Sequence, residues 1–131
     1  MKILICEDEE IMLTALEFRL RKHGFEVIVA ENGKEALEKI QAFTPDIIVA
    51  DIMMPFVTGL ELVHFVRQDM KSSLPIIVIS SLENDEIVLE AFRLGASDFI
   101  TKPFKPNELI LRIKKILQDL KQQQEELKAS A

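Results

Sequence analysis

The sequence predicts an α/β fold in which five parallel strands alternate with five helices that cover both faces of one sheet. Five short apolar segments, at residues 3–6, 27–30, 47–50, 76–79 and 99–100, alternate with segments of helical periodicity, which is the pattern of repeated strand–helix units. Residues 47–50 show no polar alternation, as is typical of parallel strands buried on both faces. The 131 residues, 48% of them apolar, suffice for one domain with its own core.

The composition excludes several classes of protein. A net charge of −6, from 22 acidic and 16 basic residues, leaves no general basic surface for nucleic acid. Cys6 is the only cysteine and lies in the first apolar segment, which excludes a disulfide framework and favours a reducing compartment. No apolar run approaches the length of a membrane span. We therefore expect a cytoplasmic protein that does not itself bind DNA or a membrane.

End signals bound the first two helices. The first should run from about residue 10 to residue 23, and Gly24 can supply the left-handed residue that ends it. Asn32 can cap the second helix, and Thr44 before Pro45 ends it, because a residue that precedes proline disfavours the helical region. The positions expected to face the sheet are Leu13, Leu16 and Leu20 in the first helix and Ala36, Leu37 and Ile40 in the second.

The remaining helices follow the same logic. The third begins at Gly59, and the fourth ends at Gly95. The fifth begins near Pro106, and its apolar positions, spaced by four and three, continue to Leu127. The part beyond about residue 118 is expected to project from the body, either as a coiled-coil linker or as a frayed, solvated tail. The inward positions are Leu62, Phe65 and Val66 in the third helix, Ile87, Ala91 and Leu94 in the fourth, and Leu109, Ile113, Ile116 and Leu120 in the fifth.

Charged and hydroxyl side chains follow four of the strands. Glu7 and Asp8 follow the first, Asp51 the third, Ser80 the fourth and Lys102 the fifth. Right-handed crossovers place these strand ends at one edge of the sheet, and a reversal of winding between the first and third strands would open a crevice there. Three carboxylates repel one another unless a cation lies among them, and Mg²⁺ prefers such oxygen ligands. The set suits phosphoryl transfer with Asp51 as the nucleophile.

Each of these residues also has an ordinary explanation. Asp8 or Glu9 could cap the first helix, Ser80 could be a strand-end hydroxyl, and Lys102 could be a solvated strand end. Their joint placement at one edge of the sheet is what favours a functional site.

Four stretches carry a resemblance to the receiver domain of two-component response regulators. They are residues 3–9, residues 51–55 with Gly59, residues 75–81 and residues 95–104. The resemblance covers about residues 1–120, which we expect to form the receiver domain, and it implies a flavodoxin-like sheet with strand order 2-1-3-4-5. Residues 121–131 would be a C-terminal helical extension, or a linker toward an effector domain beyond this sequence.

The resemblance implies a role for each site residue. Asp51 would be the phosphoacceptor, and Glu7, Asp8, Asp51 and the Met53 carbonyl would hold Mg²⁺. Ser80 and Lys102 would contact the phosphoryl group, with the Lys102–Pro103 bond in the cis form. Ser80 and Phe99 would form the switch. Phe56 stands where the family commonly has a glycine or another small residue.

The function implied is that of a phosphorylation switch rather than a metabolic enzyme. A sensor histidine kinase would donate a phosphoryl group to Asp51, and the domain would catalyse its own phosphorylation and dephosphorylation. The face formed by the fourth helix, fifth strand and fifth helix would then change shape. That change would control an effector domain, a partner protein or a homodimer formed through this face or through the C-terminal helix.

Two other functions compete with this interpretation. Phosphatases with an aspartate nucleophile resemble this pattern but carry a second acid two residues later, where this chain has Met53. A receiver with an idle pocket, acting only through protein contacts, would be expected to lack one of the site residues, and all of them are present. Both alternatives are therefore disfavoured.

Overall fold

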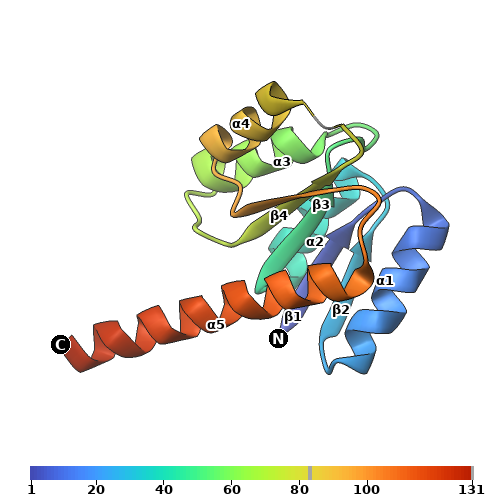
Figure 1. The fold of residues 1–131 in the computed structure, drawn as a ribbon. Helices are drawn as coiled ribbons and strands as arrows, with labels where there is room; N and C mark the ends of the chain where they lie inside the picture. Colours follow the sequence, from blue (N-terminus) through green and yellow to red (C-terminus); the bar gives the residue numbers. More distant parts are fainter. Residues whose placement is uncertain (83, 131) are drawn as a thin grey trace.

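The computed structural model describes residues 1–82 and 84–130 and contains the five-stranded parallel sheet that the sequence predicts. Its strand order is β2-β1-β3-β4-β5, which confirms the flavodoxin-like arrangement (Figure 1). Each predicted strand is present and is longer than predicted by one or two residues. The strands are β1 (Lys2–Cys6), β2 (Glu26–Ala30), β3 (Ile47–Asp51), β4 (Ile76–Ser80) and β5 (Asp98–Thr101).

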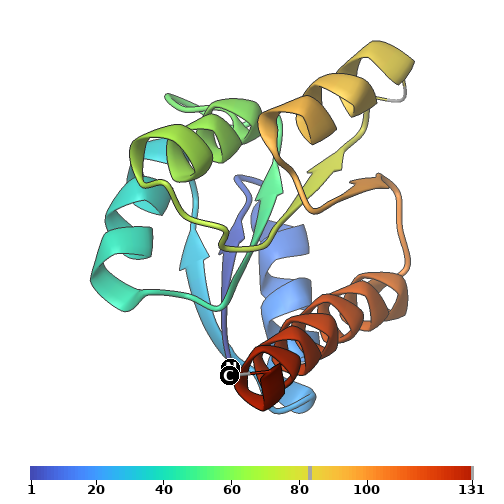
Figure 2. The ribbon, with the colours of Figure 1, turned by 90° about the vertical axis from the view of Figure 1, so that its left-hand side faces the viewer.

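Helices cover both faces of this sheet. They are α1 (Glu10–Lys22), α2 (Gly33–Phe43), α3 (Gly59–His64), the π-helical segment η1 (Phe65–Asp69), α4 (Asp85–Leu94) and α5 (Pro106–Ser130). Helices α1 and α5 lie on one face, and α2, α3 and α4 lie on the other (Figure 2). Because side chains alternate along a strand, β1 sends Ile3 and Ile5 into the first layer and Leu4 and Cys6 into the second.

The winding reverses at β1, and this reversal creates the crevice. Strand β1 pairs with β2 on one side and with β3 on the other, and Cys6 lies opposite Ala50. The residues that follow, Glu7 and Asp51, therefore leave neighbouring strands at the carboxyl edge of the sheet. Ligands of open α/β sheets bind at such a switch point.

Local signals place the helix ends where the sequence predicted them. The Asn32 side chain accepts a hydrogen bond from the Glu35 amide at 2.8 Å, and Gly24 and Gly95 adopt positive φ values of 88° and 110°. The third helix departs from the prediction, because it widens into the π-helical segment η1, in which the Met70 amide donates to the Phe65 carbonyl.

Helix α5 is unbroken to Ser130, and residues 121–130 are all exposed. The predicted stripe is confirmed only in part. Leu109 and Ile113 are buried, and Ile116 is half-buried against the core. Ile110 and Leu117, which were not predicted, are buried instead of Leu120, which is half-buried. Steps of four and three follow a coiled-coil seam, and this helix instead packs a wider stripe on a sheet. Ala131, the last residue of the predicted extension, lies outside the described residues. None of the helices described here combines the length and the apolar character needed to cross a bilayer.

The loop between β3 and α3 contains a strained residue. The Val57 amide donates to the Pro55 carbonyl at 2.9 Å, and the intervening Phe56 has a φ of 71°. This is a γ-turn of the rarer, positive-φ kind. Phe56 is 79% exposed and belongs to neither core cluster, so packing within the domain does not offset the strain.

We predict that Phe56→Gly raises the free energy of unfolding by about 0.5–1 kcal/mol. Glycine adopts a positive φ without the steric cost of a β-carbon, and this gain is larger than the loss caused by the extra conformational entropy that glycine gives the unfolded chain. Urea denaturation followed by circular dichroism measures the change. Phe56→Ala is the control, since it removes the ring but keeps the β-carbon, and it should be no more stable than the wild type. A glycine variant that is no more stable than the alanine variant would contradict the prediction.

Candidate functional site

Three carboxylates meet at the carboxyl edge of the sheet. Glu7 and Asp8 follow β1, and Asp51 is the last residue of β3. One oxygen from each lies within 4.8 Å of one from the other two. Glu7 and Asp51 are buried and Asp8 is exposed, so the cluster is open to solvent on the side of Asp8.

The Lys102 ammonium lies among these acids. Lys102 follows β5, its amide donates to the Ser80 carbonyl at 2.7 Å, and the Lys102–Pro103 bond is cis, as predicted. Its Nζ donates to Glu7 Oε1 at 2.5 Å and to Asp51 Oδ2. Burial disfavours the charged ammonium, but the hydrogen bonds and the negative charge of Asp51 and Glu7 outweigh it and raise the pKa of Lys102. Lys102 therefore remains a cation at this edge.

Glu7 is the acid most affected by its surroundings. Burial raises its pKa from 4.5 to about 7, and the neighbouring Asp51 acts in the same direction, while the bond to Lys102 acts in the opposite direction. One ammonium therefore does not fully compensate two buried carboxylates, and a divalent cation would favour the ionised form.

Asp51 is oriented by contacts to both of its carboxylate oxygens. Oδ1 accepts a hydrogen bond from the Met53 amide at 2.8 Å, and Oδ2 accepts one from Lys102. Gly59 allows the chain to pass close behind, since a β-carbon there would lie 2.5 Å from the Asp51 carbonyl oxygen. The backbone thus fixes the carboxylate at the mouth of the crevice.

The two predicted switch residues lie on the neighbouring strands. Ser80 is buried at the end of β4, and its hydroxyl accepts a hydrogen bond from the Leu82 amide at 3.0 Å. Since Ile79 lies opposite Asp51, Ser80 is one residue further toward the same edge. Phe99 is half-buried in β5 opposite Val78 and packs against the core cluster of α2, α3 and α4. Phe99 is therefore beside the core and not within the acidic cluster.

Glu9 is a neighbour of the site that sequence reasoning missed. It precedes α1 without making a side-chain cap, so the capping explanation fails for it. Instead its carboxylate lies 3.7 Å from Lys102 Nζ. Its place in the run Glu7-Asp8-Glu9-Glu10 was the available signal.

The described residues at the cluster offer oxygen donors from three carboxylates. Such a donor set fits Mg²⁺ better than zinc, which favours histidine and cysteine. The group can therefore accept a hard divalent metal, with Lys102 close enough to share the negative charge.

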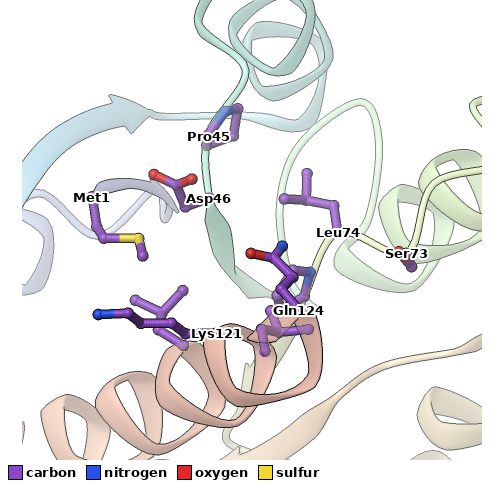
Figure 3. A pocket seen from close by; sticks show the side chains of 10 residues that line it. Met1, Pro45, Asp46, Ser73, Leu74, Lys121 and Gln124 are labelled. Atoms are coloured by element: carbon purple, nitrogen blue, oxygen red, sulfur yellow. The ribbon is translucent and has the colours of Figure 1, made fainter. Parts of the chain in front are cut away.

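A cavity of about 470 Å³ lies at the opposite edge of the sheet (Figure 3). The cavity lies between α5 and the loops that contain Pro45 and Leu74, and the charged side chains that line it are those of Asp46 and Lys121. One carboxylate and one ammonium do not make a reactive cluster, so we assign no chemistry to it.

Comparison with known proteins gives a consistent result. A family model described as the response regulator receiver domain matches residues 3–114, which include every site residue discussed above. The alkaline phosphatase synthesis transcriptional regulatory protein PhoP of Bacillus subtilis (strain 168) is 40% identical over 116 residues, 88% of this chain and 48% of that protein. The chain thus spans about half the length of this relative.

Solved structures agree with the family model. The receiver domain of the Francisella response regulator 1452 superposes with a TM-score of 0.86 at 32% identity, covering 91% of this chain and 98% of that one. A CheY-like receiver domain protein from Methanospirillum hungatei JF-1 gives a TM-score of 0.87 at 26% identity, covering 93% and 97%.

The raised pKa of Glu7 predicts a pH dependence of stability in metal-free buffer. The folded protein keeps a proton on Glu7 up to about pH 7, whereas the unfolded chain releases it near 4.5. The protonated Glu7 therefore stabilises the folded state fully below about pH 4.5, and this stabilisation is lost as the pH rises through 7. Glutamine does not titrate, so Glu7→Gln avoids this loss. The free energy of unfolding of Glu7→Gln minus that of the wild type should therefore increase by roughly 1–3 kcal/mol as the pH rises from about 4.5 to 8.

Urea denaturation across this pH range tests the prediction. Glu38→Gln, at an exposed position on α2, is the matched control and should keep a constant difference from wild type. A Glu7→Gln difference that does not change with pH would show that Glu7 is already ionised in the folded protein.

Proposed function

The chain belongs to the response regulator receiver domain family, and from that premise we propose that it is a phosphorylation switch with Asp51 as the phosphoacceptor. The observation that carries the proposal is the environment of Asp51: a buried carboxylate at a switch point, bound on one oxygen by Lys102 and on the other by the Met53 amide. These two contacts hold the nucleophile in one orientation. The phosphoryl donor would be a sensor histidine kinase.

In this proposal, Glu7, Asp8, Asp51 and the Met53 carbonyl hold Mg²⁺. Bound there, the metal would neutralise charge on the transferring phosphoryl group. One Asp51 oxygen attacks phosphorus, the P–O bond forms as the P–N bond to the donor imidazole breaks, and the imidazole leaves with the electron pair and takes up a proton. Lys102 shifts from the carboxylate to a phosphoryl oxygen, which preserves its ion pair. The domain would catalyse this reaction, and the later hydrolysis, on itself.

The switch follows from the added charge. A phosphoryl group adds three acceptor oxygens and about −1.5 to −2 charge. In the unphosphorylated domain, the Ser80 hydroxyl accepts a hydrogen bond from the Leu82 amide. After phosphorylation, this hydroxyl can turn to donate a hydrogen bond to a phosphoryl oxygen. That movement would free space for Phe99 to turn inward and would reshape the face of α4, β5 and α5.

Exposed apolar side chains beside the acidic edge support a protein donor. Ile11, in the first turn of α1, is 87% exposed and lines a hollow with Met12 and Phe104. Such a rim can bind the protein that carries the phosphohistidine. The single free thiol, Cys6, is buried, and we place the protein in the cytoplasm, where it would meet the kinase.

The output surface offers two alternatives. Leu89 and Phe92 on α4 and Leu111 on α5 are exposed, and Arg112 pairs with Asp98 and Glu108 within the chain. This face could bind an effector or a second copy. The exposed part of α5, with Leu127, is the second surface for a homodimer or the lead into an effector domain.

Intact-mass analysis after incubation with acetyl phosphate tests the function. We expect one phosphoryl adduct on the wild type with Mg²⁺, and at least tenfold less adduct without metal, because two buried carboxylates and a phosphoryl group would otherwise share one ammonium. Asp51→Asn should give none. Asp119→Asn, exposed on α5, is the matched control and should react like wild type. An adduct that survives Asp51→Asn would contradict the assignment.

A further inference from the structure

Arg67 joins three parts of the backbone at the edge of the sheet opposite the acidic cluster. It lies in η1, and its Nε donates to the Gly95 carbonyl at 2.9 Å. Its Nη1 donates to the carbonyls of Ser72, at 2.9 Å, and Leu74, at 2.7 Å. The side chain therefore ties the end of the third helical segment to the loop before β4 and to the residue that ends α4. Only a guanidinium offers this fork of donors.

Gly95 is shaped to this contact. Its φ of 110° is left-handed, and a β-carbon there would lie 2.8 Å from Arg67 Cγ. The amide of Gly95 closes the last turn of α4 on Phe92, and that of Ala96 closes it on Ala91. Ala91 is also the only fully buried residue of α4. The last turn of α4 is thus held by packing, by two backbone bonds and by Arg67.

Among the described residues, the first turn of α4 is held less firmly: Ile87 is only half-buried, although it packs against the same core cluster as Ala91. Asp85 and Glu86 are exposed. Among residues 1–82 and 84–130, the side-chain hydrogen bond found at this end is the helix's own cap, from the Ile87 amide to Asn84 at 2.8 Å. In Figure 2 the end of α4 that leads to Gly95 lies beside α3, and the other end projects beyond the body. The two ends of the helix are therefore held with unequal strength.

We propose that Arg67 is a positioning residue that acts as the pivot of α4, holding its last turn in place while its first turn swings when Ser80 moves. This inference rests on the proposed function, since phosphorylation of Asp51 is what moves Ser80. The first turn follows the strand that ends at Ser80, so displacement enters the helix there. A helix fixed at one end tilts, and its displacement falls to near zero at the pivot.

The tilt defines which residues change their surroundings. Leu89 and Phe92, the exposed apolar residues of α4, lie between the free end and the pivot. Leu89 is closer to the free end and moves further. A partner that reads this face would therefore distinguish the two states mainly through the first half of α4.

Hydrogen exchange read by mass spectrometry tests the pivot, with peptides that separate residues 85–88 from residues 91–96. In the wild type, acetyl phosphate with Mg²⁺ should change the exchange rate at residues 85–88 by at least about fivefold, in either direction. The rate at residues 91–96 should stay within about twofold of its value before phosphorylation, because a firmly held segment opens less readily than a weakly held one. Arg67→Lys keeps the charge but loses the fork. Even before phosphorylation, this variant should exchange on the order of tenfold faster at residues 91–96, because the hydrogen bonds that the charged guanidinium donates to the backbone carbonyls are lost.

Arg93→Lys is the matched control, because Arg93 lies on α4 with its side chain 75% exposed and forms a long ion pair with Glu90, at 4.0 Å, on the same helix. It should exchange like wild type. Equal changes at both ends of α4 in the wild type, no change at either end, or unaltered exchange at residues 91–96 in Arg67→Lys would each overturn the pivot. Intact mass read on the same samples reports the Asp51 adduct, so a failed pivot and a failed phosphorylation site give different results. If Arg67→Lys does not fold, the wild type alone can still overturn the pivot, by showing no difference in the response of residues 85–88 and residues 91–96.

Discussion

The balance between buried carboxylates and one ammonium is the interaction on which the site depends. Glu7 and Asp51 leave adjacent strands and are both buried, and like charges at this separation cannot both ionise without a cation. Lys102 supplies that cation by bonding to both. The arrangement leaves Glu7 with a pKa raised to about 7, which means that the charge is only partly compensated. In the proposed function, a further cation would complete this compensation and allow a phosphoryl group to bind.

The fold divides the domain into an edge that carries chemistry and an edge that anchors. At the carboxyl edge, strand ends converge on Asp51, and Asp8, Met53 and Phe56 in the loops that follow are exposed. At the amino edge, polar contacts lock the loops together: Arg67 binds three carbonyls, and Ser97 accepts a hydrogen bond from the Ile76 amide. Helix α4 connects the two edges. A charge change at one edge can therefore move one end of α4 while the other end stays fixed.

Much of this could be predicted from the sequence, because the signals are local. Apolar runs gave the strands, and Gly24, Asn32 and Gly95 marked helix ends. The acids and Lys102 could be placed together because parallel strands end at one edge. Other features depend on tertiary contacts that no local pattern encodes. The φ of Phe56 is imposed by the loop that closes on Pro55, and the bonds of Arg67 join residues up to 28 positions apart.

Borohydride reduction tests most directly whether the carboxylate of Asp51 is the group that accepts the phosphoryl group. An acyl phosphate on aspartate is reduced to homoserine, which peptide mapping locates. After treatment with acetyl phosphate and Mg²⁺, homoserine should be found at position 51 alone. Homoserine at position 8, or a phosphorylated protein without any homoserine, would contradict this role of Asp51, because the phosphoryl group would then be on another residue.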